Sequence, residues 1–166
     1  MMQPDAEPSG VSVRPIEPDD AQRLLGFHAQ LSTDTTYSRF FGVHPQLSDV
    51  ELRRFTHVDH HDREALVAIH DDEIIGVARF DQFGDDRAEA AFVVRDDWQN
   101  CGVGHLLIRH LISRAREEGI PRLVAETLTS NTRMLAVFRG SGPVVRMSHR
   151  DGVVLVELDL TVMTPS

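Results

Sequence analysis

The segment VVRDDWQNCGVGHLL, residues 93–107, constrains the fold of this chain more than any other stretch. A β-branched run ends in charged residues, and two glycines one residue apart, Gly102 and Gly104, precede an amphipathic run. This pattern predicts a strand that turns through glycines into a helix. The start of such a helix presents unpaired backbone N–H groups and the positive end of its dipole to an anion. The segment therefore predicts a phosphate-binding turn.

The residues on both sides of this turn predict a parallel crossover. AEAAFVV (88–94) alternates like a strand, and RLVAETL (122–128) is typical of a buried strand. Between them we expect a helix over residues 102–118, ended by Gly119 and Pro121. Its apolar stripe consists of Val103, Leu106, Leu107, Leu111 and Ala115. A strand-helix-strand unit of this kind is expected to be right-handed and parallel.

The rest of the chain predicts antiparallel strands and flanking helices. Strands are expected at 11–16, 64–70, 73–80, 143–149 and 153–160, and helices at 18–30, 33–41, 48–58 and 131–139. The predicted fold class is α/β of the mixed α+β kind, with a mostly antiparallel sheet and one parallel βαβ crossover. We expect a disordered tail at 1–10, a single domain over 11–160, and a short tail at 161–166.

Composition excludes several classes of function. The net charge of −9 argues against sequence-independent binding of nucleic acid and suits a cationic substrate such as an amine. No apolar run approaches the roughly 20 residues that span a bilayer, so we expect no membrane association. A single cysteine, Cys101, is typical of a reducing compartment and predicts a cytoplasmic protein. All 17 basic residues are arginine, which fits either a codon-biased genome or an enzyme that modifies lysines.

Three known kinds of phosphate ligand can be compared with the glycine turn. An NTP-binding P-loop requires a lysine, and the chain contains none. A dinucleotide fingerprint requires a third small residue where this chain has Leu107, although Glu126 lies where a ribose-binding acid could sit. A dinucleotide domain also repeats βαβ units, and one is predicted here. The third kind of ligand is an acyl-coenzyme A.

The hexapeptide Gln99–Gly104 resembles Q/R-x-x-G-x-G/A, the pyrophosphate loop of the Gcn5-related N-acetyltransferases (GNAT). The resemblance covers residues 11–160. The stretches SRFFGVHPQLS, FTHVDH and NTRMLAVFRGSG look similar to bacterial, particularly actinobacterial, protein lysine acetyltransferases that act on acyl-CoA synthetases. This resemblance implies the GNAT fold, acetyl-CoA as co-substrate and transfer of acetyl to a protein lysine. Such enzymes often carry a regulatory domain, so the chain is expected to be either a stand-alone enzyme or the catalytic domain of a longer parent protein with a regulatory domain.

The resemblance also implies a set of cofactor-binding residues. Backbone amides of residues 101–105 would hold the pyrophosphate, and backbone groups of Phe92 and Val94 would pair with the pantetheine arm. Many relatives have Gly-Arg where this chain has Asn100-Cys101, which predicts a lower affinity for CoA. Many also have a tyrosine, acting as general acid, where this chain has Phe138. The cofactor set is Phe92, Val93, Val94, Gln99, Asn100, Cys101, Gly102, Val103, Gly104, His105, Asn131 and Phe138.

Acyl transfer to an amine requires an uncharged amine, and lysine's reference pKa of about 10.4 leaves little of it near neutral pH. A positioned carboxylate can accept the proton. Glu89 is the first candidate base, because it shares a predicted apolar strand face with Ala91 and Val93, where burial would favour proton uptake. It also matches the base of the related lysine acetyltransferases. Glu126 is the second candidate. The N–H of Val94 is expected to polarise the thioester carbonyl.

Other functions stay open at this stage. An acetyltransferase of the same fold could act on a small-molecule amine, and a non-catalytic acyl-CoA-binding regulatory domain would bind without turnover. The stretch HVDHHD (57–62) contains three histidines and two aspartates. Its spacing matches no usual zinc framework, so no metal site is predicted.

Overall fold

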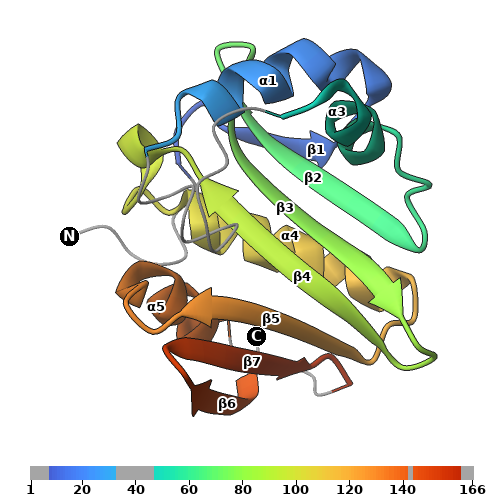
Figure 1. The fold of residues 1–166 in the computed structure, drawn as a ribbon, viewed down its shortest axis with the longest axis vertical. Coiled ribbons are helices and arrows are strands. Elements are labelled where there is room, and N and C mark those ends of the chain that lie inside the picture. Colours follow the sequence, from blue (N-terminus) through green and yellow to red (C-terminus); the bar gives the residue numbers. More distant parts are fainter. Residues whose placement is uncertain (1–7, 33–46, 142–143, 162–166) are drawn as a thin grey trace.

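The computed structural model describes residues 8–32, 47–141 and 144–161, and contains a seven-stranded sheet in the order β1-β2-β3-β4-β5-β7-β6 (Figure 1). All neighbouring strands are antiparallel except β4 and β5. The strands are β1 (Ser12–Pro15), β2 (Arg63–His70), β3 (Glu73–Phe83), β4 (Arg87–Val94), β5 (Arg122–Leu128), β6 (Val144–Arg150) and β7 (Val153–Asp159). The α-helices are α1 (Ala21–Ala29), α3 (Asp49–Thr56), α4 (Val103–Glu117) and α5 (Thr132–Gly140), with short 3-10 turns at Pro18–Asp20 and Asp96–Trp98.

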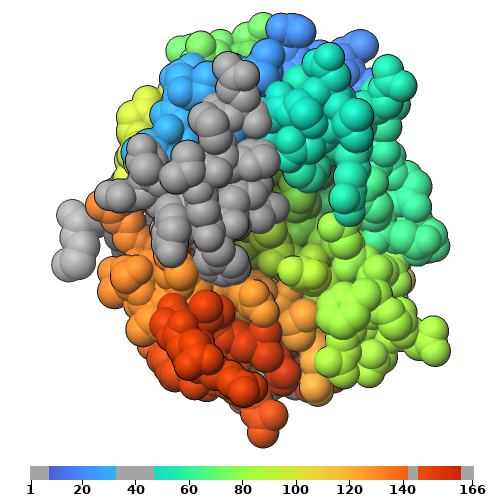
Figure 2. All heavy atoms as spheres, viewed as in Figure 1, coloured from blue at the N-terminus to red at the C-terminus, as the bar shows by residue number. Residues whose placement is uncertain are grey.

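Helices cover the two faces of the sheet. Helix α4, which lies between β4 and β5 in the chain, crosses one face (Figure 1). Helices α1 and α3 lie on the other face, at the end opposite β6 and β7 (Figures 1 and 2). The expected stripe of α4 is buried, together with Ile108 and Ile112. Burying each valine, leucine or isoleucine side chain of this set contributes about 1.5–3 kcal/mol, which holds α4 firmly on the sheet. No helix in residues 8–32, 47–141 or 144–161 is long and apolar enough to cross a membrane.

The predicted mixed fold class with a single parallel pair is confirmed. Most element bounds lie within a few residues of expectation. One prediction was wrong: β3 continues beyond Phe80 to Phe83, because Asp81–Phe83 pairs with the start of β4. The expected helix over 33–41 and most of the two expected tails lie outside the described residues.

Candidate active site

A cleft of about 820 Å³ opens where β4 and β5 separate. The two strands pair at Ala88–Leu123 and Glu89–Val124 only, and their carboxyl ends then diverge. The carboxyl ends of both strands lie beside α5 and the loop that enters α4 (Figure 1). All four elements line the cleft. Its volume lies within the range of small-molecule and cofactor sites, about 300–1,000 Å³.

The register of β4 determines which backbone groups face this cleft. In an antiparallel pair, alternate residues exchange hydrogen bonds with the partner strand, and those between them point away from it. The N–H of Arg95 donates to the carbonyl of Ile75 at 2.8 Å, and the β3–β4 register continues without a shift through Gly76. The backbone groups of Phe92 and Val94 are therefore directed away from β3, towards the cleft. Such a strand edge can bind an extended ligand arm.

Gln99 connects this strand to the glycine loop. Its side-chain amide donates to the carbonyl of Val94 at 3.0 Å, and its side-chain oxygen accepts from Arg133 on the first turn of α5. Because the Val94 carbonyl is bonded in this way, its N–H is the group left to face a ligand. The loop thus contacts both walls of the cleft.

An ion pair fixes the turn that precedes the loop. The guanidinium of Arg95 donates to both carboxylate oxygens of Asp97, at 2.7 and 3.0 Å, and to Glu73 at 3.2 Å. The hydrogen bond from Arg95 holds the pKa of the Asp97 carboxyl below its usual value. Trp98 then packs against the ring of His70 with ring centroids 4.6 Å apart. These contacts set the direction in which the chain enters the glycine loop.

The loop enters α4 through left-handed backbone. Asn100 has φ 62° and Gly102, the N-cap of α4, has φ 87°. Glycine adopts this region freely, and asparagine is among the few other residues that tolerate it. Asn100 is therefore suited to the loop conformation. The N-cap Gly102 has no side chain that could bond the first amides of α4, so within the described residues the anion-binding start of this helix borders the cleft without a capping side chain. This cradle fits a pyrophosphate.

Gly104 sets the approach of the two helices beside the cleft. A Cβ at this position would lie 3.2 Å from Cγ2 of Val137 on α5. The second glycine of the motif therefore lets α5 pack close to the first turn of α4, in addition to leaving the backbone open. A larger side chain would displace α5 and its cleft-lining residues.

Gly104→Val is expected to weaken acetyl-CoA binding at least tenfold and to lower stability by about 1–3 kcal/mol, because the added methyl groups overpack the α4–α5 contact. Calorimetric titration and thermal unfolding measure the two effects. Gly104→Ala should show a smaller change of the same kind. Wild-type affinity in the valine variant would contradict this role.

Glu89 and Glu126 both line the cleft on the face of the sheet opposite α4. Side chains alternate between the two faces of a sheet. Phe92 on β4 and Ala125 on β5 belong to the core under α4, so Glu89 and Glu126, at positions of opposite parity on the same strands, point to the other face. Both carboxylates are exposed. The expected burial of Glu89 was therefore wrong, because the cleft leaves this edge of β4 uncovered.

Helix α5 supplies the remaining predicted residues. Asn131 caps α5, its side-chain oxygen accepting from the N–H of Met134 at 3.2 Å. Phe138 is buried, and its ring meets Phe92 edge to face at 5.5 Å between centroids. No tyrosine lies among the described lining residues, and Tyr37, in the segment 33–46, lies outside the described residues.

The cleft brings together most of the residues predicted from sequence. Those that line it are Glu89, Phe92, Val93, Val94, Gln99, Asn100, Gly102, Gly104, His105, Glu126, Asn131 and Phe138. Cys101 and Val103 do not line it, and the side chain of Val103 is buried in the core under α4. The prediction for these two concerned their backbone amides. Among the lining residues that sequence reasoning missed are Thr127, Ser130 and Arg133, although the last two lie within two positions of the predicted Asn131.

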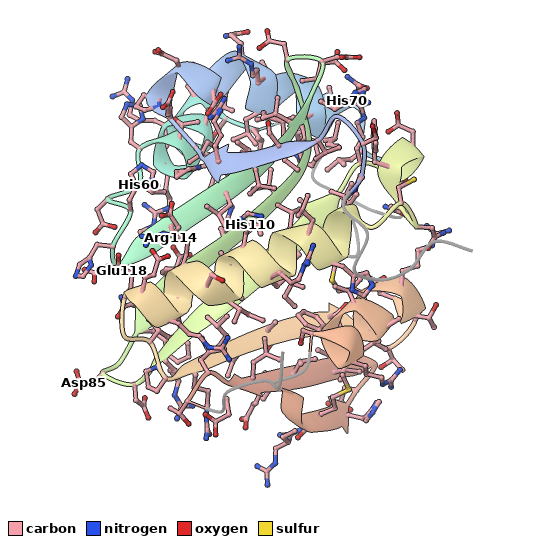
Figure 3. The ribbon with its side chains drawn as sticks, turned by 180° about the vertical axis from the view of Figure 1, so that it is seen from behind. His60, His70, Asp85, His110, Arg114 and Glu118 are labelled. Carbon is pink, nitrogen blue, oxygen red and sulfur yellow. The ribbon has the colours of Figure 1, made fainter. Side chains whose placement is uncertain are left out.

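The histidine-rich stretch 57–62 contributes nothing to this cleft. His60 binds Glu64 at 2.7 Å and His61 binds Glu118, near the C-terminal end of α4 (Figure 3). In the part of the chain that the structure describes, no group of three or more histidine, cysteine, aspartate or glutamate side chains could hold a metal ion.

Comparison with known proteins identifies the family. The profile of the acetyltransferase (GNAT) family matches residues 30–142. The chain belongs to the GNAT family. Membership confirms the predicted GNAT fold and the expectation of an acetyltransferase.

Individual GNAT relatives agree with the predicted branch. Acetyltransferase Pat of Mycolicibacterium smegmatis is 33% identical over 89% of this chain, and acetyltransferase PA5475 of Pseudomonas aeruginosa is 30% identical over 75%. The crystal structure of the GNAT domain of S. lividans PAT has a TM-score of 0.84 and 42% identity, covering 90% of each chain. The chain spans 45% of the length of Pat and 69% of PA5475. The resemblance to actinobacterial protein acetyltransferases is thereby confirmed.

Proposed function

We propose that this chain transfers acetyl from acetyl-CoA to the ε-amine of a lysine in another protein, and that the lysine is the catalytic one of an acyl-CoA synthetase. The observation that carries the chemistry is the two-sided cleft between β4 and β5. The open start of α4 borders it at Gly102, while Glu89 and Glu126 lie on the opposite face of the sheet. The similarity to Pat and PAT supports the choice of a protein substrate.

Different elements of the cleft would bind different parts of acetyl-CoA. Amides at the start of α4 would hold the pyrophosphate, and the backbone of Phe92 and Val94 would pair with the pantetheine arm as a strand does. This arrangement brings the thioester to the carboxyl end of β4. The N–H of Val94 would then donate to the thioester carbonyl oxygen and stabilise the charge that develops on it.

The acceptor amine approaches from the face that carries the carboxylates. Glu89 takes a proton from the ammonium group, directly or through a water, and Glu126 is the second base or positions the amine. The neutral amine attacks the thioester carbonyl in a ternary complex, the nitrogen releases a proton to solvent as the amide bond forms, and the C–S bond breaks. Coenzyme A leaves as the thiolate. Phe138, packed on Phe92, supplies no proton, so we expect the thiolate to be protonated from solvent.

The test combines a titration with an acetylation assay. We expect saturable binding of acetyl-CoA and none of NADH, which a dinucleotide site would bind. With a purified acyl-CoA synthetase, mass spectrometry should then find acetyl on the catalytic lysine and none in a variant with arginine there. Acetylation of small amines alone would favour the small-molecule alternative, and binding without turnover would favour a regulatory acyl-CoA-binding domain.

Two further expectations belong to this proposal. A regulatory domain in a longer parent protein is consistent with the share of Pat that the chain spans. A cytoplasmic location stays a prediction from the single cysteine.

A further inference from the structure

The glycine loop has backbone amides but no basic side chain to offer a phosphate. From Gln99 to Gly104 the sequence has no basic side chain, and the next residue is His105. The ligand of the proposed function carries a pyrophosphate and a 3′-phosphate, whose charge favours a guanidinium partner. A basic side chain at this end of the cleft would therefore have to come from another element.

Arg133 is the one arginine among the described residues that line the cleft. It lies on the first turn of α5 and donates to the side-chain oxygen of Gln99, the residue that opens the glycine loop. Arg133 is exposed, and this contact holds its guanidinium beside the loop. Because Gln99 also binds the Val94 carbonyl, the guanidinium is coupled to the strand edge of the cleft.

The acidic and the basic side chains that line the cleft come from different elements. The carboxylates Glu89 and Glu126 come from the strands, on the face opposite α4. A third acid, Asp96, accepts hydrogen bonds from Ser32, at 2.9 Å from its N–H and 2.6 Å from its hydroxyl. Arg133 lies beside the glycine loop through its contact with Gln99. An anionic group is thus favoured at the loop and a cationic group at the strands.

We infer that Arg133 binds a phosphate of the acyl-CoA and supplies the positive charge that the glycine loop itself lacks. The inference rests on the proposed function. Arginine suits this role because its planar fork can bond two phosphate oxygens at once and remains charged at all physiological pH values.

The test compares Arg133→Gln with Arg139→Gln, a matched change at an exposed arginine of the same helix that does not line the cleft. Arg133→Gln should raise the Kd for acetyl-CoA by about tenfold at low salt, and Arg139→Gln should leave it unchanged. Added salt should shrink the difference, because it screens exposed charges. Arg133→Lys, which keeps the charge without the fork, should lie between wild type and Arg133→Gln. Thermal unfolding checks that each variant is folded.

Truncated donors separate phosphate binding from a positioning effect through Gln99. With S-acetylpantetheine, which has no pyrophosphate or 3′-phosphate, Arg133→Gln should match the wild-type kcat/KM. Acetyl-3′-dephospho-CoA, which lacks the 3′-phosphate, identifies the phosphate that Arg133 binds. If Arg133→Gln still raises the Kd for this donor, Arg133 binds the pyrophosphate; if the Kd equals that of wild type, Arg133 binds the 3′-phosphate. An unchanged Kd for acetyl-CoA, or an equal loss with S-acetylpantetheine, would overturn the inference. Failure of the wild-type protein to bind acetyl-CoA would instead contradict the proposed function.

Discussion

Glu89→Gln is expected to lower kcat/KM for lysine acetylation at neutral pH by at least about 100-fold, the usual range for loss of a general base. Glutamine keeps the size and polarity of the side chain but cannot accept the amine proton. Because Glu89 lines the cleft as an exposed side chain away from the glycine loop, the Kd for acetyl-CoA should stay at its wild-type value. Steady-state kinetics and calorimetric titration measure the two quantities separately.

The pH dependence distinguishes a lost base from a distorted site. In Glu89→Gln, the rate should rise about tenfold per pH unit towards the lysine pKa of about 10.4, as the fraction of neutral amine grows. Asp85→Asn, an exposed change in the β3–β4 turn, should match wild type (Figure 3). Full activity of Glu89→Gln at pH 7 would refute the assignment, and a larger loss in Glu126→Gln would transfer the role to Glu126.

The parts of the fold that were predicted correctly are those that depend on sequence patterns among neighbouring residues. The apolar period of α4 and the glycines before it depend on residues within one or two helical turns, so the sequence alone placed this helix within one residue of its observed start. The end of β3 did not follow from such signals. Gly84 and its acidic neighbours indicate a loop, but pairing with β4 extends the strand to Phe83.

In the candidate site, too, the features that depend on residues close in sequence were predicted, and those that depend on distant residues were not. The glycine loop and the β4 edge were recognised because their residues are close in sequence. Arg133 was missed although it lies two residues after the predicted Asn131, because its contact with Gln99 joins residues 34 apart and no local pattern indicates such a contact. The exposure of Glu89 was misjudged for a related reason, since strand alternation shows which face a side chain takes but not whether that face is covered.

Contacts between distant residues also stabilise the fold outside the cleft. Glu64 on β2 is 1% exposed, and its carboxylate accepts from Arg114 of α4 at 3.1 Å and contacts His60 at 2.7 Å. Arg114 also bonds Glu117 at 2.5 Å and Glu118 at 2.9 Å. Burial lowers the pKa of the Arg114 guanidinium, but these carboxylates raise it more, so it stays above its ordinary value. The network fastens the C-terminal end of α4 to β2 (Figure 3).

Arg114→Met is expected to lower the free energy of unfolding by about 3 kcal/mol, because it leaves the buried Glu64 carboxylate without its guanidinium partner. For a chain of this length, that corresponds to a fall in Tm of roughly 10 °C. Arg150→Met is the matched control. Its pair with Asp151 spans 3.9 Å between side chains more than 90% exposed, so the change should have little effect. Thermal and urea unfolding measure both variants.

A double variant identifies the source of the loss. If the cost comes from an unpaired buried charge, Glu64→Met combined with Arg114→Met should be more stable than Arg114→Met alone, because apolar side chains of similar size can replace a buried ion pair. If the cost comes from lost packing of the arginine stem, the second substitution should restore nothing. A Tm within about 2 °C of wild type for Arg114→Met, roughly the shift of a 0.5–1 kcal/mol change, would show that the network contributes little to the attachment of α4.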